Sequence, residues 1–426
     1  MKKILILTFC IFNFSFIFAN ILIPMDLSQT DHLKAYGVVY FALENGLDSK
    51  WLLNYRGGSF LIPENSEIEN ICRIRGIYYE KVSPVEIIQI EQIIQKSNMD
   101  IVYLEKAPNI AVYTLPESTV GKVAGFAGEP WDDAVTLALT YAEIPYDTVW
   151  DLEVLQGQLE EYDWLHLHHE DFTGQFGKFY ASFRNADWYK EIVRIEMEMA
   201  SKFGFEKVWQ LKHAVAEMIR EYVKNGGFVF AMCAATDTYD IALAAKGLDI
   251  CDTVFDGDPM DPKAEQKLDF DRTFAFKDFT LVKNPYEYEF SSIDASNYAQ
   301  LRGAEADYFT LFQFSAKYDP VPTMLTQCHV NVVNGFLGQT TSYHKEFIKK
   351  SVITLAEVDG ADEVKYLHGN FGRGTFTFYG GHDPEDYQHR IGDPQTYLEL
   401  YKNSPGYRLI LNNILFPAAK KKKLKT

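Results

Sequence analysis

The stretch FVFAMCAATD, Phe228–Asp237, joins an apolar run to a cysteine and a cluster of small residues. An amphipathic stretch at 207–224 precedes it and ends at a glycine pair, a common stop signal for a helix. The apolar run is typical of a buried strand, and residues 236–245 have the composition of a helix. Helix, strand and helix in this order indicate one repeat of a parallel α/β sheet, with Cys233 at the strand-to-helix turn.

Strand and helix patterns alternate on both sides of this stretch. Apolar runs at 110–113, 146–150 and 375–379 have strand character, as does the beginning of YDWLHLHHEDF at 162–172. Residues 131–143 have helical character, with small side chains suited to close packing. Strands that alternate with helices at this spacing predict an α/β fold with a parallel sheet covered on both faces.

The chain divides into unequal parts. A small N-terminal α/β unit is expected at 20–106, where apolar runs at 21–23 and 51–53 flank a helical stretch at 31–44 in a βαβ pattern. The main α/β domain is expected at 107–416. It carries an acidic, aromatic-rich insertion at about 252–307, and a basic tail follows at 417–426.

The first 19 residues have the order of a secretory signal peptide. Two lysines precede an apolar run that ends at Ala19, and the run is shorter than the ~20 residues that span a bilayer. An exported protein is therefore expected, periplasmic or extracellular, without a transmembrane segment in the mature chain. The net charge of −18 makes nucleic acid an unfavourable partner, whereas a hydrophobic fraction of 47% supplies a large core. A small molecule or a glycan is the expected partner.

Cys233 is the candidate nucleophile. Ala231 and Ala235 stand two positions on either side of it, where a tight nucleophile elbow requires small residues. A thiol at a helix N-terminus also gains backbone N–H groups that stabilise a thiolate or an oxyanion. The alternative is an inert buried cysteine, because cysteine is among the most buried residue types. Export would also allow Cys72, Cys233, Cys251 and Cys328 to pair, in any of three connectivities.

His382 is the candidate base for this thiol. It follows the late strand at 375–379, and Asp383 and Glu385 stand close enough in sequence to orient an imidazole. Because the carboxyl ends of parallel strands meet at one edge of a sheet, His382 and Cys233 are expected to share a cleft. The alternative is a turn residue, since Gly-Gly-His-Asp-Pro is a strong turn composition.

A second constellation, HLHHED, follows the strand at 162–167. His166, His168 and His169 are candidate ligands for zinc or another divalent ion, and His382 could complete such a site. His168, His169, Glu170 and Asp171 are also candidate substrate-binding residues at the same sheet edge. The alternative is a set of structural histidines that hydrogen-bond to backbone or carboxylate groups.

Arg56 is the remaining candidate. It lies in Arg56-Gly57-Gly58-Ser59, just past the apolar run at 51–53, where the ligand-facing loops of a parallel sheet lie. It is therefore a candidate substrate-binding residue. A glycine turn with an exposed arginine is the alternative.

The chain resembles two known groups. The elbow cysteine and the late G-H-D-P-E resemble class I glutamine amidotransferase-like domains, and the strand YDWLHLHHEDF resembles the related trehalose-utilisation-type proteins. The segments WLLNYRGGSF, WDDAVTLALTYAEIPYD, WLHLHHEDFTGQ and FAMCAATDTYDIALAA resemble an exported bacterial family often labelled asparagine synthetase B. These resemblances imply a flavodoxin-like sheet and Cys233–His382 amide chemistry.

The chain departs from these groups at several positions. The synthetase label is unsupported by motifs, because Lys2 replaces the cysteine that follows the initiator methionine and no S-G-G-x-D-S loop occurs. Both elbow glycines of the amidotransferases are alanines here, and Asp383 is inserted before the proline. Two function classes remain: a stand-alone thiol hydrolase of amide or related acyl bonds, and a non-catalytic or metal-dependent protein that binds an envelope glycan or small ligand.

Overall fold

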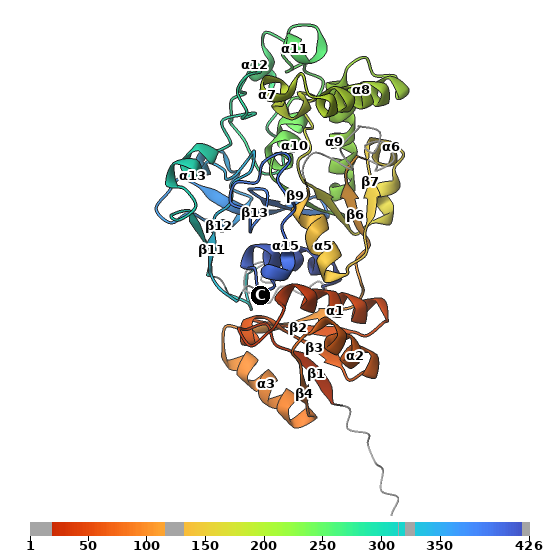
Figure 1. Cartoon of the computed structure of the whole chain (residues 1–426), viewed down its shortest axis with the longest axis vertical. Coiled ribbons are helices and arrows are strands. Elements are labelled where there is room, and N and C mark those ends of the chain that lie inside the picture. The colour runs from red at the N-terminus through yellow and green to blue at the C-terminus, as the bar shows by residue number, and fades with distance from the viewer. Residues whose placement is uncertain (1–18, 116–131, 314, 320–328, 420–426) are drawn as a thin grey trace, which may run out of the picture.

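The computed structural model describes residues 19–115, 132–313, 315–319 and 329–419. The predicted signal peptide up to residue 18, Cys328, and the tail from residue 420 lie outside the described residues. The described chain contains a small sheet near its N-terminus and a larger mixed sheet, with helices on both (Figure 1). The predicted α/β class is confirmed. None of the described helices combines the length and the apolar character needed to cross a bilayer.

The N-terminal unit is an antiparallel sheet with the strand order β4-β1-β3-β2-β5. Its elements are β1 (Asn20–Ile23), α1 (His32–Glu44), β2 (Ser49–Leu53), β3 (Ser59–Pro63), α2 (Ser66–Arg75), β4 (Glu80–Val82), α3 (Pro84–Lys96) and β5 (Asp100–Leu104). The predicted βαβ pairing is wrong, because β3 lies between β1 and β2 and pairs antiparallel with both. The loop between β2 and β3 is therefore a hairpin connection and not the carboxyl edge of a parallel sheet.

The larger sheet contains nine strands, in the order β11-β10-β12-β13-β14-β9-β8-β6-β7. Its parallel part consists of β6 (Ile110–Tyr113), β7 (Asp147–Val149), β8 (Trp164–Leu167), β9 (Phe228–Met232) and β14 (Gly374–Tyr379). Neighbouring strands of this part are parallel throughout. Numbered along the chain, these five strands have the spatial order 2-1-3-4-5.

An antiparallel extension continues the sheet beyond β14, where sequence reasoning predicted no strands. It comprises β10 (Tyr308–Leu311), β11 (Val332–Asn334), β12 (Ile353–Glu357) and β13 (Val364–Phe371). β13 pairs antiparallel with β14 and with β12, and the β12 pairing contains irregular register shifts. The segment that leads to it carries only short helices, α11 (Thr253–Asp256), α12 (Ala264–Lys267) and α13 (Ser296–Arg302).

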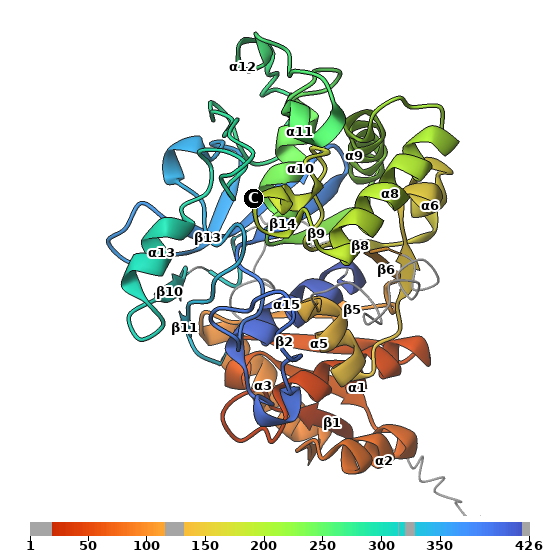
Figure 2. The ribbon, with the colours of Figure 1, turned by 45° about the horizontal axis from the view of Figure 1, so that its top comes forward.

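Helices cover both faces of the parallel strands (Figures 1 and 2). They are α5 (Ala134–Ala142), α6 (Asp151–Leu155), α7 (Tyr180–Phe183), α8 (Asp187–Lys202), α9 (Val208–Lys224), α10 (Ala235–Ala244) and α15 (Pro405–Leu415). Side chains alternate along β9. Phe228, Phe230 and Met232 join the core that contains α1, α5 and α15, whereas Val229 and Ala231 join the core that contains α9 and α10. Successive side chains of β9 therefore enter opposite cores, and because both faces of the strand are buried, its sequence is apolar throughout.

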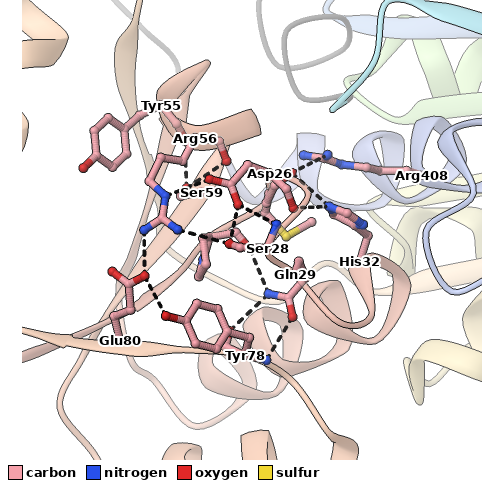
Figure 3. A network of polar contacts seen from close by, with 12 residues as sticks. Asp26, Ser28, Gln29, His32, Tyr55, Arg56, Ser59, Tyr78, Glu80 and Arg408 are labelled. Atoms are coloured by element: carbon pink, nitrogen blue, oxygen red, sulfur yellow. Dashed lines mark hydrogen bonds and ion pairs between the residues drawn. The ribbon is translucent and has the colours of Figure 1, made fainter.

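Arg408 on α15 ties the N-terminal unit to the larger domain (Figure 3). Its guanidinium is fully buried and donates to the carbonyl oxygens of Met25 and Gly57 and to the hydroxyl of Tyr36. α1 packs against both α5 and α15 across the same boundary. A buried guanidinium needs several acceptors, and these acceptors come from the N-terminal unit. The contacts of Arg408 therefore hold the two units in one fixed arrangement.

Candidate active site

Cys233 adopts a backbone conformation that most residues avoid. It follows β9 directly and has φ = 53°, in the left-handed region, before α10 begins at Ala235. For a non-glycine residue this conformation costs about 1–3 kcal/mol, and such strain concentrates at functional sites. Ala231 and Ala235 are both fully buried, so larger side chains would not fit on either side of this turn. The backbone therefore has the form of a nucleophile elbow.

A loop from the antiparallel extension covers the Cys233 sulfur. The backbone N–H of Gln339 donates to Sγ at 3.2 Å, and the Gln339 side chain donates to the carbonyl oxygens of Gly177 and Tyr288 at 2.8 and 3.1 Å. The buried Lys365 Nζ donates to Phe336 O at 2.6 Å and to Thr341 O at 2.8 Å. Lys365 thus holds the two ends of the loop in place, and the loop presents an N–H group at the thiol.

The thiol of Cys233 is neutral at physiological pH. Burial raises its pKa to about 11, although backbone N–H groups of Thr340, Gln339 and Ala234 favour the thiolate. Cys233 is also a free thiol, as are Cys72 and Cys251. A sulfur with this pKa becomes a nucleophile only if a neighbouring base accepts its proton.

Strands β8, β9 and β14 end at the same edge of the sheet (Figure 2). Leu167 lies opposite Ala231 and Tyr379 lies opposite Met232, so the residues that follow each strand emerge side by side. The N–H of Ala235 donates to the carbonyl of His168 at 3.0 Å and fixes the elbow to the end of β8.

Four histidines gather at this edge. The ring centroids of His168 and His169 lie 3.9 Å apart, and those of His169 and His382 lie 4.2 Å apart. His382 also stacks on His389, with a centroid separation of 4.6 Å. The pKa of His382 lies well below its usual range, mainly because of burial and secondly because of the neighbouring histidines. Burial also lowers the pKa of His169 well below its usual range. Both imidazoles are therefore neutral at physiological pH.

Asp133 anchors two of the predicted histidines from outside the cluster. Its carboxylate caps α5 through the N–H groups of Val135 and Thr136. The same carboxylate lies 3.1 Å from His166 Nε2 and 3.1 Å from His168 Nδ1. Burial opposes its ionisation, but the two imidazoles hold the pKa of Asp133 well below its usual range.

His166 does not belong with His169 as the predicted metal set requires. Its Nδ1 lies 3.1 Å from Phe230 O, and its Nε2 contacts Asp133, so both ring nitrogens are engaged. Among the described residues, His168, His169 and His382 have one ring nitrogen each within 4.8 Å of one another, and His166 instead groups with His168 and Asp133. His166 lies within β8, whereas His168 and His169 follow the end of that strand.

Asp383 and Glu385 hydrogen-bond with groups other than His382. Asp383 accepts the backbone N–H of Glu385 at 2.9 Å, and the Glu385 carboxyl hydrogen-bonds with Ser404. Burial raises the pKa of both carboxyl groups. Within the described part of the chain, neither ring nitrogen of His382 has a hydrogen-bond partner. The expected orienting role of these two carboxylates is therefore wrong.

His389 was missed by sequence reasoning. Its ring forms ion pairs with Asp132 at 2.6 Å and with Asp386 at 3.0 Å. Burial opposes its charge, but these carboxylates raise the pKa of His389 to about 9, so it is a cation stacked on neutral His382. Its position in the same loop as His382, between charged residues, was the available signal.

Three other predicted residues lie outside the cavity wall. Asp171 accepts the N–H groups of Thr173 and Gly177 and stabilises the loop after β8. The carbonyl of Glu170 accepts the Thr238 hydroxyl at 2.7 Å. Arg56 lies in the N-terminal unit and forms 2.8 Å ion pairs with Asp26 and Glu80 (Figure 3). Both carboxylates stabilise its charge, and Arg56 does not line the cavity beside Cys233.

A cavity of about 480 Å³ opens beside Cys233. It is lined by His169, Phe179, Ser182, Phe183, Cys233, Tyr288, Gln300, Leu337, Gly338, Gln339, His382, Gln388, His389, Arg390 and Ile391. Aromatic rings form one part of its wall, and amide, guanidinium and imidazole groups form another. A mostly apolar cavity with a few converging polar groups is typical of a small-ligand site.

No protein-family model matches the chain, and no curated protein matches its sequence. Among solved structures, it is similar to the cytoplasmic proteins STM3548 and STM1381 of Salmonella typhimurium, at 10% and 12% identity and TM-scores of 0.34 and 0.36. The matches cover 74% and 73% of this chain and 100% of each of those chains. The GH42 β-galactosidase Gan42B matches at 10% identity and a TM-score of 0.24, over 65% of this chain and 28% of its own. Similarities this low assign no activity or ligand.

Proposed function

We propose that this chain is an exported thiol hydrolase of class I glutamine amidotransferase type that cleaves an amide or related acyl bond. The observation that carries the proposal is the left-handed backbone of Cys233 between a buried strand and a helix, with its sulfur in the wall of the cavity that His382 also lines. The parallel strand order 2-1-3-4-5 is that of flavodoxin-like sheets and supports the fold assignment.

The reaction begins from a neutral thiol and a neutral imidazole. His382 accepts the proton of Cys233 as the sulfur attacks the acyl carbon. Backbone N–H groups at the elbow, together with that of Gln339 in the covering loop, stabilise negative charge. The tetrahedral intermediate collapses to a thioester, and the leaving amine takes the proton from the imidazolium. Water then hydrolyses the thioester, which releases the acid and restores the thiol.

Export supports a hydrolytic role over a synthetic one. The order of residues 1–19 favours secretion, and a secreted protein has no access to cytoplasmic ATP. We therefore propose hydrolysis without coupled asparagine synthesis, despite the resemblance to the family with that label.

Trapping with an electrophilic glutamine analogue, such as a diazoketone, tests the proposal. We expect one covalent adduct on the mature chain, located at Cys233 by peptide mapping and absent from Cys233→Ser. Cys251→Ser is the matched control, because Cys251 is also a buried free thiol but donates to Thr173 O away from the cavity wall. An adduct that persists in Cys233→Ser, or no adduct at all, would contradict the proposal.

Ligand binding without turnover is a second candidate function. It is favoured by the 1% exposure of Cys233 and by the aromatic wall of Phe179, Phe183 and Tyr288, which suits a sugar or another ring. In that case Cys233→Ser would bind the ligand as tightly as the wild type, and an acyl-enzyme would never form. Binding measured by calorimetry on Cys233→Ser, with mass spectrometry of the wild type, separates the two functions.

A further inference from the structure

We propose that His168, His169 and His382 form a binding site for a divalent transition-metal ion, with zinc as the best fit. The site goes beyond the proposed function, because metal binding by three imidazoles requires neither Cys233 nor turnover. It also replaces the metal set expected from sequence, with His382 in the place of His166.

The first observation is convergence. One ring nitrogen of each of the three histidines lies within 4.8 Å of the other two. Nitrogens bound to one tetrahedral zinc ion, each at 2.0–2.1 Å, lie about 3.4 Å apart. Small rotations of the rings would therefore bring the three nitrogens onto one ion. The rings come from two separate strand ends, β8 and β14, so they are assembled by the fold.

The second observation is unsatisfied polarity. His168 and His382 are only 2% and 6% exposed. Among the described residues, no hydrogen-bond partner exists for His168 Nε2 or for either ring nitrogen of His382. Buried polar groups are almost always paired, and each unpaired one requires an explanation such as an ion. One cation bound between the two rings would engage His168 Nε2 and one ring nitrogen of His382.

The third observation is the arrangement of groups behind the rings. His168 Nδ1 lies 3.1 Å from the Asp133 carboxylate, and His169 Nε2 lies 3.1 Å from the Asp132 carbonyl oxygen. Metal-binding histidines usually contact a carboxylate or carbonyl oxygen through the nitrogen that does not bind the metal. Asp133 is itself fixed as the N-terminal cap of α5, so it can hold the His168 ring in one orientation.

The chemistry of the donors selects the ion. Imidazole nitrogens suit zinc, copper, iron and nickel, whereas magnesium and calcium prefer oxygen ligands. Three protein ligands with one open position are typical of catalytic zinc sites. His169 and His382 line the cavity, so an ion bound between them would lie at the cavity wall and could contact a ligand there.

Titration of tag-free mature protein with Zn²⁺, after treatment with EDTA and dialysis, tests the site. We expect about one equivalent by calorimetry, and binding at least about 10-fold weaker in His168→Gln and in His382→Gln. His213→Gln is the matched control, because His213 is a buried histidine whose nitrogens also have no partner within the described residues and which belongs to no candidate metal group there. Its binding should equal that of the wild type.

Less than a tenth of an equivalent in the wild type, or equal binding in all three variants, would overturn the proposal. If a variant fails to fold, the absorption bands of Co²⁺ bound to the wild type decide, since a histidine-rich tetrahedral site gives intense visible bands. A bound ion occupies a nitrogen of His382, the proposed base. Metal binding is therefore also measured on Cys233→Ser, and thiol chemistry on metal-free protein, so that either proposal can fail alone.

Discussion

Replacing Cys233 by glycine and by alanine measures the strain stored at the elbow. The left-handed conformation at φ = 53° costs about 1–2 kcal/mol for a residue with a Cβ and nothing for glycine. Glycine in turn loses about 0.5–1 kcal/mol relative to alanine through chain entropy. Both variants remove the same sulfur, so the difference between them isolates the backbone. We expect Cys233→Gly to be more stable than Cys233→Ala by up to about 1.5 kcal/mol.

The neighbouring Ala234 supplies the control, because it has φ = −62° and ψ = −22° in the right-handed region. Ala234→Gly should be less stable than the wild type by about 0.5–1 kcal/mol, with the opposite sign to the effect at position 233. The free energy of unfolding is measured by urea denaturation at pH 7. If Cys233→Gly is less stable than Cys233→Ala, the elbow is not strained and the main argument for a functional cysteine is lost.

Three further predictions concern the groups around the site. Asp133→Asn keeps a residue suited to capping α5 but removes the charge beside His168. Zn²⁺ binding measured by calorimetry should therefore weaken about 10- to 100-fold, and unchanged binding would contradict this role of Asp133. Lys365→Met leaves the carbonyl oxygens of Phe336 and Thr341 without their donor. The free energy of unfolding measured by urea denaturation should therefore fall by about 2–5 kcal/mol. A change under about 1 kcal/mol would show that other contacts hold the loop. Burial raises the pKa of Asp237 to about 7. Between pH 4 and 7 the folded chain therefore keeps a proton that the unfolded chain loses, so the free energy of unfolding falls as the pH rises. The free energy of unfolding of the wild type should therefore decrease relative to Asp237→Asn from pH 4 to pH 7, and a constant difference would place the pKa of Asp237 near its ordinary value.

The sequence predicted the parallel strands better than the antiparallel ones. The ends of β6 and β9 were found at the correct residues, because a strand buried on both faces is a continuous apolar run between polar or glycine-rich segments. β3 was missed, since SFLIP directly follows two glycines and ends in proline, which resembles a loop. β13 was missed because Gly369 and Asn370 interrupt its apolar pattern, and its place depends on pairing with β12 and β14.

The candidate site was predictable where one rule applied and not where it depended on distant loops. Because parallel strands end at one edge, Cys233, His169 and His382 could be expected to lie together, and all three line the cavity. The covering loop around Gln339 could not be expected, since it belongs to the antiparallel extension. The position predicted for Arg56 was wrong for a different reason, because β3 pairs antiparallel with β2 and the loop between them is a hairpin, not the edge of a parallel sheet.

The rate at which iodoacetamide alkylates Cys233 between pH 6 and 10, in metal-free wild type and in His382→Gln, tests most directly whether this thiol is an activated nucleophile. Burial raises its pKa to about 11 despite the opposing backbone N–H groups, so reaction near pH 7 requires a base. General-base assistance contributes about 10²- to 10⁴-fold. We expect the wild type to react near neutrality and His382→Gln to react at least about 100-fold more slowly at pH 7. Equal rates in the two proteins, or a Cys233 that stays unmodified up to pH 9, would contradict the proposed thiol hydrolase.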